Sequence, residues 1–130
     1  MSGFVRRPGE GESFDFQGAV FTVKASGRDT EGRVGVMEQW APGGLRVPGH
    51  THEGEDEMFQ VLDGHVRGYC GDDRFDAPTG AFIFLPRDVE HGLEVVGDTP
   101  ARLLTIVGPA EFDRIVVENG DPIGVDVTHP

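Results

Sequence analysis

The chain is poor in cysteine and in long apolar runs. Its 130 residues include a single cysteine, Cys70, so no disulfide can form within the chain. A small disulfide-stabilised secreted scaffold is therefore excluded, and a reducing cytoplasm is the expected location. No apolar stretch approaches the roughly 20 residues that span a bilayer. None follows Arg6 and Arg7 as a signal peptide would require, so neither a membrane span nor a signal peptide is expected.

Positive charge is also scarce. The 11 Lys and Arg residues are outnumbered by 23 Asp and Glu residues, which gives a formal net charge of -12. Nucleic acids and anionic membrane surfaces bind clustered basic side chains, so neither is expected as a partner. The simplest interpretation of the acidity is that it keeps the protein soluble.

Glycine and proline, by contrast, are abundant and dispersed. The 20 Gly and nine Pro residues separate short apolar runs, which is typical of an all-β chain with many turns. A chain of this length can build one hydrophobic core but not two, so a single domain over 1–130 is expected. Strands are predicted over 13–16, 19–25, 33–41, 46–52, 57–63, 65–70, 73–77, 81–85, 90–96 and 101–108.

Two local signals refine this outline. Asp63-Gly64 stands between apolar runs and predicts a two-residue hairpin, whose central positions need positive φ. One short helix is predicted over 110–118. Phe112, Ile115 and Val116 recur there at helical spacing and are expected to pack the helix against the sheets.

Histidine and glutamate recur at spacings that suit a metal ion. The pattern occupies two segments, Gly44-x5-His50-x-His52-x4-Glu57-x6-Gly64 and Gly80-x5-Pro86-x4-His91. A nitrogen-rich set of ligands with one carboxylate favours Fe, Mn, Co, Ni, Cu or Zn over Ca or Mg. The sequence therefore predicts one divalent transition metal as cofactor.

Strand geometry explains these spacings. In an extended strand, His50 and His52 point to the same face, with Cα atoms roughly 6.6 Å apart. Glu57 is at an odd offset from His52 and would face away unless Gly54 breaks the strand and resets the alternation. His91 is distant in sequence, so the fold must bring two strands together to complete the site.

The two segments resemble the two motifs of the cupin superfamily. Every position of the first motif matches, whereas Asp88 replaces the usual Gly of the second motif and Val95 its usual Asn. Asp is among the better-tolerated substitutes for Gly where φ is positive. The resemblance implies a double-stranded jelly-roll barrel with His50, His52, Glu57 and His91 around one metal. It also implies a homodimer, for which strands over 13–25 are the expected contact.

Strand alternation predicts which side chains surround the metal. Residues that share a face with Glu57 or His91, or that line neighbouring strands, are Trp40, Phe59, Val61, Phe82, Phe84 and Leu93. They are interpreted either as ordinary jelly-roll core or as an apolar pocket for a small-molecule substrate, and both interpretations use the same residues.

The remaining titratable residues have simpler interpretations. His65 and His129 are read as surface or hydrogen-bonded structural residues, since a lone histidine usually is one. Glu53 and Glu55 belong to an acidic run with Asp56, and such a run is more often a solvated loop. Only Glu57 fits the motif register, which makes it the candidate ligand or catalytic base.

Three classes of function remain open. The first is a dioxygenase similar to the small quercetin dioxygenase-like cupins, with Glu57 taking a substrate proton or binding the metal. The second is a non-redox enzyme similar to the cupin polyketide cyclases or isomerases, in which a Lewis-acid metal polarises a carbonyl. The third is a non-catalytic cupin that binds a small molecule. The expectation is an enzyme acting on a hydrophobic, oxygenated small molecule, with the dioxygenase preferred.

Overall fold

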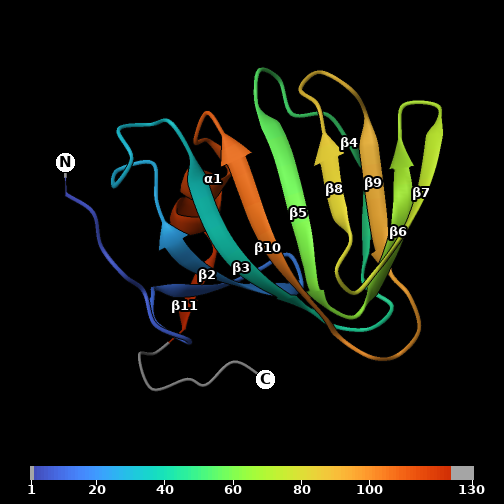
Figure 1. Ribbon diagram of the computed structural model, residues 1–130, viewed down its shortest axis with the longest axis horizontal. Coiled ribbons are helices and arrows are strands. Elements are labelled where there is room, and N and C mark those ends of the chain that lie inside the picture. Colours follow the sequence, from blue (N-terminus) through green and yellow to red (C-terminus); the bar gives the residue numbers. More distant parts are fainter. Residues whose placement is uncertain (1, 124–130) are drawn as a thin grey trace.

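Alternating apolar and polar residues fold into a two-sheet β-sandwich with one short helix (Figure 1). The structure is a computed structural model and describes residues 2–123, so His129 lies outside the described residues. Its strands are β1 (Ser13–Phe16), β2 (Ala19–Ala25), β3 (Gly35–Ala41), β4 (Arg46–His50), β5 (Asp56–Asp63), β6 (His65–Cys70), β7 (Asp73–Pro78), β8 (Phe82–Leu85), β9 (His91–Val95), β10 (Ala101–Gly108) and β11 (Asp121–Ile123). The helix is α1 (Phe112–Asn119). The predicted all-β jelly-roll with one C-terminal helix is confirmed.

The strands divide unequally between the two sheets. Over the described residues, the larger sheet has seven strands in the order β11-β1-β2-β3-β10-β5-β8, and the smaller has four in the order β4-β9-β6-β7. Figure 1 shows the small sheet beside the β5 and β8 end of the large one. Each motif segment contributes to both sheets, with β4 paired to β9 in the small sheet and β5 paired to β8 in the large one. The two segments therefore lie side by side, and their residues can face one another across the sandwich.

The core lies between the sheets and follows the two-residue period of the strands. Every second residue of β3 and β10 is buried, including Met37, Leu103 and Val107, each with no exposed surface. Burying a side chain of this size contributes about 1.5–3 kcal/mol. This close-packed layer fixes which face of each strand can carry functional side chains.

The predicted hairpin at Asp63-Gly64 is wrong. Gly64 does have positive φ, at 103°. However, β5 pairs with β10 and β8, while β6 pairs with β7 and β9, so the chain crosses from one sheet to the other at Gly64. A Cβ at this position would come 2.7 Å from the Ala101 Cα, so close approach also requires glycine here.

Helix α1 packs against β1 and β3 through two of the three predicted side chains. Val116 is fully buried and Phe112 is partly buried, whereas Ile115 is 37% exposed. Buried Asp113 faces the sheet in addition and accepts a hydrogen bond from the Gly27 amide at 2.8 Å. Within residues 2–123, no helix is long and apolar enough to cross a membrane.

Candidate metal centre

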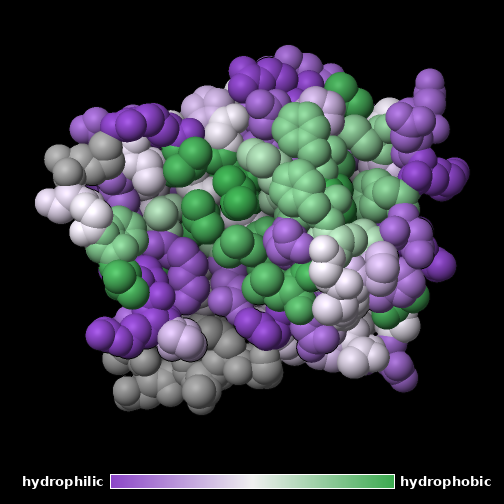
Figure 2. Space-filling view, viewed as in Figure 1, coloured by the Kyte–Doolittle hydropathy of each residue, from purple (hydrophilic) through white to green (hydrophobic). Residues whose placement is uncertain are grey.

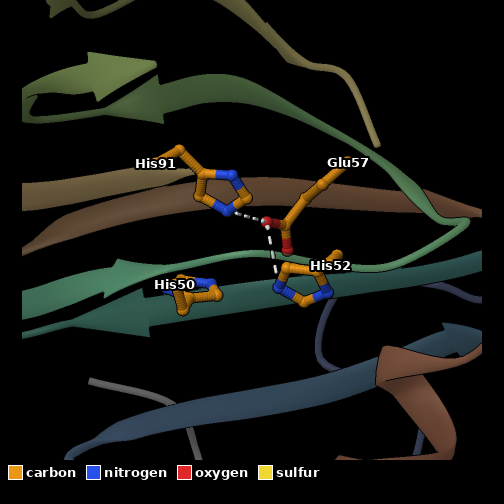
Figure 3. Close-up of side chains that lie close together, drawn as sticks. All are labelled: His50, His52, Glu57 and His91. Atoms are coloured by element: carbon orange, nitrogen blue, oxygen red, sulfur yellow. Dashed lines mark ion pairs between the residues drawn. The ribbon is translucent and has the colours of Figure 1, made fainter. Parts of the chain in front are cut away.

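The four predicted ligands converge between the two sheets (Figure 3). One potential donor atom from each of His50, His52, Glu57 and His91 lies within 4.8 Å of the others. His50 ends β4 and is the register partner of His91 at the start of β9, while Glu57 is contributed by β5 of the opposite sheet. Residues far apart in sequence therefore form a cluster that could bind a metal ion.

His50 and His91 are oriented by their own backbone. The Nδ1 of His50 donates to the Pro48 carbonyl at 2.9 Å, and the Nδ1 of His91 donates to the Val89 carbonyl at 3.3 Å. A carbonyl can only accept, so each Nδ1 carries the proton and each Nε2 keeps a lone pair. Both rings can therefore bind a metal ion through the Nε2 lone pair, and their centroids lie 4.5 Å apart.

The buried atoms at the centre fit a metal ion. Glu57 and His91 are 4% and 2% exposed, and the Glu57 Oε1 lies 3.3 Å from the His91 Nε2 and 3.8 Å from the His52 Nε2. Among the described residues, the buried His91 Nε2 has no hydrogen-bond partner. Leaving such a group unsatisfied costs about 1–3 kcal/mol. Three imidazoles and a carboxylate with donor atoms this close together could therefore bind a metal ion.

Two residues with positive φ shape the loops around the cluster. Gly54 has φ 72° and lies in the turn between His52 and β5, so the break before Glu57 is present as its spacing predicted, although β4 already ends at His50. Asp88 has φ 66°, the conformation expected where the cupin motif has glycine. The Asp88 Oδ1 accepts from the Gly54 amide at 3.0 Å, and the Asp88 amide donates to the His52 carbonyl at 2.9 Å. The side-chain hydrogen bond, which glycine could not make, therefore adds to the backbone connection between the two motif segments.

An exposed ion pair makes a second connection between the motifs. Arg87 donates from its backbone amide and its Nε to the Asp56 Oδ1, at 2.9 and 3.2 Å, and from its Nη2 to the Oδ2 at 3.1 Å. These side-chain and backbone hydrogen bonds hold the pKa of the Asp56 carboxyl below its usual value. The start of β5, next to Glu57, is thereby held to the turn that leads to His91.

His52 is oriented by Glu55, a residue that the sequence analysis placed in a solvated loop. That prediction is wrong, because Glu55 is only 3% exposed. Its Oε1 accepts from the His52 Nδ1 at 2.9 Å, and its Oε2 accepts from the amides of Glu111 and Phe112, each at 2.8 Å. The hydrogen bond to Glu55 is the main cause of a raised pKa at His52. The burial of the ring opposes the increase, and the negative charges of Glu57 and Glu55 add to it.

The sequence contains only a weak signal for this role. Glu55 stands three residues after His52, close enough to reach its ring, but its other partners lie at the start of α1, 56 and 57 residues away. A carboxylate is favourable at a helix N-terminus, although nothing in the local sequence indicates which one will reach it.

The predicted pocket residues divide between the interior and the outer surface. Phe59 and Val61 are 5% and 1% exposed and share the inward face of β5 with Glu57. Leu93 is partly buried and packs against the core beside His91. These three side chains lie where the alternation placed them.

Phe82, Phe84 and Trp40 do not lie in the interior, and their assignment to the pocket was wrong. In β8 the register pairs Ile83 with Phe59, so these residues point inward and Phe82 and Phe84 point out, at 58% and 52% exposure. The buried positions of β3 alternate with Trp40, which places its side chain on the outer face. Inside the sandwich, Ile83 and Leu85 occupy the positions expected of the two phenylalanines.

Comparisons with known proteins agree with this architecture. The sequence profile of the cupin domain matches residues 36–107. Quercetin 2,3-dioxygenase of Bacillus subtilis is 23% identical over 119 residues, which is 92% of this chain and 35% of that enzyme. An uncharacterized protein of Methanocaldococcus jannaschii is 25% identical over 69 residues, or 53% of this chain and 55% of that protein. The chain thus spans about a third and about half of the length of these two relatives.

Solved structures also share the fold. A protein described as a predicted oxalate decarboxylase from Thermotoga maritima superposes with a TM-score of 0.74 and 19% identity, covering 82% of this chain and 99% of that one. KdgF from Halomonas sp. gives a TM-score of 0.74 at 16% identity, covering 87% of this chain and 99% of that one. At such identities the likeness shows the fold alone.

Proposed function

The chain belongs to the cupin family, and from this premise we propose that it is a metal-dependent enzyme that acts on a hydrophobic, oxygenated small molecule. The preferred reaction is that of a quercetinase-like dioxygenase. The observation that carries the proposal is the convergence of three imidazoles and one carboxylate at a largely buried point between the sheets. The similarity to a quercetin dioxygenase, which extends over 92% of the chain, supports the choice of reaction.

The residues that would hold the metal are His50, His52 and His91, through Nε2, and Glu57. A divalent Fe, Mn, Ni, Co, Cu or Zn ion bound there would supply a Lewis acid that orients and polarises a substrate oxygen. Each imidazole is presented by a hydrogen bond on its Nδ1, so the chain provides rings that are already oriented.

Glu57 is proposed to act on the substrate proton as well. Its carboxylate is buried beside the apolar residues Phe59 and Leu85, the latter being its cross-strand partner. A hydroxyl that reaches this carboxylate could transfer its proton to the oxygen that is not directed at His91. The apolar walls exclude water and strengthen electrostatic interactions at the site. Phe59, Val61 and Leu93 are proposed to form the apolar surroundings of a bound substrate.

A non-redox reaction is the second candidate, because the same ligands suit zinc. With zinc, polarisation of a carbonyl and proton abstraction by Glu57 would serve a polyketide cyclase or an isomerase. The donor set does not distinguish the two reactions. Metal identity and the need for O₂ distinguish them.

Metal content of the untagged protein, measured by elemental mass spectrometry, is the first test. Stoichiometric Fe, Mn, Ni, Co or Cu, with O₂ uptake on addition of a flavonol, would support the dioxygenase. Stoichiometric zinc that persists under competition would favour the non-redox reaction. Absence of metal after reconstitution with each ion would reject the enzyme and leave a non-catalytic binding protein. For substitutions of the metal ligands, such as His91→Ala, the matched control is His65→Ala. His65 is hydrogen-bonded to Asp76 on the outer face of the small sheet.

A further inference from the structure

We infer that Glu55 is a positioning residue that couples occupancy of the metal site to the docking of helix α1. The inference rests on the proposed metal site. Glu55 is 3% exposed and its two oxygens have different partners, with Oε1 directed to His52 and Oε2 to the helix. One buried carboxylate therefore joins a candidate ligand to the first turn of α1.

The contacts with His52 explain why the connection affects the site. A carboxylate on the Nδ1–H of a ligating histidine fixes the orientation of the ring and increases the basicity of its other nitrogen. The ring of Phe112, the first residue of α1, also packs edge-on against the His52 ring, with centroids 5.6 Å apart. His52 thus contacts the helix both through Glu55 and through Phe112.

The contacts of Glu55 with the helix explain why metal binding should in turn stabilise the docked helix. The first amides of a helix have no partner within the helix, and the side chain of the N-cap residue Glu111 makes no capping hydrogen bond. Glu55 supplies the acceptor in its place, for the amides of Glu111 and Phe112. If docking of the helix holds His52 ready for metal, metal on His52 must stabilise the docked helix by the same factor.

Hydrogen–deuterium exchange of the full chain, with and without Zn²⁺, tests the coupling directly. Addition of Zn²⁺ is expected to slow exchange of the Glu111 and Phe112 amides by about 5-fold or more. Binding of Zn²⁺ without any change at these amides would overturn the coupling and leave the metal site standing. No binding of Zn²⁺, or of any other transition metal, would reject the proposed function and the coupling together.

Glu55→Gln sharpens the test because the amide has one acceptor oxygen in place of two. It is expected to weaken Zn²⁺ binding by about 10–100-fold and to abolish the protection of α1 by metal. Glu53→Gln, two positions away and exposed, is the matched control and should change neither. Wild-type affinity in folded Glu55→Gln protein would contradict the positioning role. The wild-type exchange experiment remains decisive if the variant fails to fold.

The outward-facing aromatic residues carry a second, independent inference: we propose that a second copy of this chain packs against the outer face of β3, β10, β5 and β8. A row of register partners crosses these four strands and is apolar throughout, formed by Val36, Ile106, Met58 and Phe84. Phe82 and Leu104 extend it in the adjacent row. Figure 2 shows the resulting apolar patch on the face turned toward the viewer.

Charge favours a second copy on this face. The chain carries a net charge of -12, so two copies repel each other over most of their surfaces. On this face, Glu38 is neutralised by Arg102 at 2.6 Å and Asp56 by Arg87 at 3.1 Å. Two copies that meet here do not bring unpaired Glu38 or Asp56 carboxylates together.

The size and position of the face also suit a dimer. Four strands of up to eight residues cover roughly 19 by 27 Å, on the order of 500 Å² when flat. Projecting side chains increase the accessible area toward the roughly 800 Å² per partner of a specific interface. The strands over 13–25, where the dimer contact was expected, are instead paired on both sides, because β11 covers β1.

Sedimentation equilibrium at physiological ionic strength tests this interface. The wild type is expected to be a dimer, and the double variant Phe82→Ser/Phe84→Ser a folded monomer. Ile115→Ser, which removes an exposed apolar side chain from α1, should remain a dimer. A monomeric wild type would overturn the proposal. A dimer that survives the double variant would also overturn it and direct attention to another surface.

Discussion

The three histidines of the metal centre are held in two different ways. His50 and His91 each donate to the carbonyl two residues earlier in the chain, so the local backbone orients them. His52 donates instead to Glu55, whose second oxygen binds the start of a helix more than fifty residues away. Two ligands are therefore set by local geometry, whereas the third depends on tertiary structure.

Because of this difference, metal binding is expected to affect the two sets of supporting elements differently. Binding at His50 and His91 acts on strands β4 and β9, which the sheet already fixes through their shared register. Binding at His52 acts on α1, a short helix that owes its position to packing. The two kinds of ligand are thus expected to respond differently to substitution of the residues around them.

Loss of a ligand itself should have the largest effect and should not depend on how that ligand is held. His91→Ala is expected to weaken Zn²⁺ binding by more than about 100-fold, beyond the range that follows loss of an outer-shell partner. Isothermal titration calorimetry measures this directly, with His65→Ala as control. Wild-type affinity in folded His91→Ala protein would refute the ligand assignment.

Removal of the carboxylate that holds His52 should have the largest effect on stability of the metal-free protein. Glu55→Ala leaves two main-chain amides and one imidazole N–H without their acceptor in a buried environment. A loss of about 2–4 kcal/mol in the free energy of unfolding is expected. Urea denaturation of Glu55→Ala and Glu53→Ala gives the comparison, and equal losses in the two variants would argue against a buried role for Glu55.

The locally determined part of the site could be predicted from the sequence. The break at Gly54 and the positive φ of Asp88 follow from turn geometry. These local conformations depend on a few neighbouring residues, so they can be predicted without knowing how the strands pair. The strand predicted over 46–52 is observed as Arg46–His50, so it contains His50 but not His52. The family resemblance supplied the distant ligand, His91.

The remaining features could not be predicted because they depend on which strands pair. Phe82 and Phe84 share one face of β8, as the alternation predicted. Which face points inward is decided only by the register of β8 against β5, and that register turns Ile83 inward and the two phenylalanines outward. Trp40 was assigned to the wrong face for a similar reason, because its own alternation along β3 does not show which face of that strand is buried. The Asp63-Gly64 turn matches a hairpin locally and becomes a crossover only because β5 already has a partner on each side.

A smaller effect is expected where a long-range contact is exposed. Asp56 and Arg87 connect the two motifs as Glu55 connects His52 to the helix, but at the surface, where solvent screens the charges. The pKa of Asp56 is lowered in the folded state, so its contribution to stability is present above the unfolded value near 3.8. It is lost as pH falls through the folded value. Asp56→Asn should therefore lower Tm by at most about 3 °C at neutral pH.

The pH dependence of stability tests whether the effect of Asp56→Asn comes from the charge of Asp56. The difference in stability between wild type and Asp56→Asn should disappear in acid, once Asp56 of the folded wild type is protonated. Denaturant titrations from neutral to acidic pH would show this convergence. A difference that is constant over the whole range would mean that the substitution acts through packing and not through the charge of Asp56.

The smallest effect is expected at the backbone-held histidine. The His91 Nδ1 binds the carbonyl of Val89 and not its side chain, so Val89→Ala preserves the acceptor and with it the orientation of the ring. Zn²⁺ affinity should stay within about 2-fold of wild type, whereas Glu55→Gln, which changes the corresponding acceptor of His52, costs about 10–100-fold. Calorimetric titration of both variants compares the two modes of support directly. Equal losses would show that His91 also depends on surrounding side chains, and the distinction between local and tertiary support would then fail.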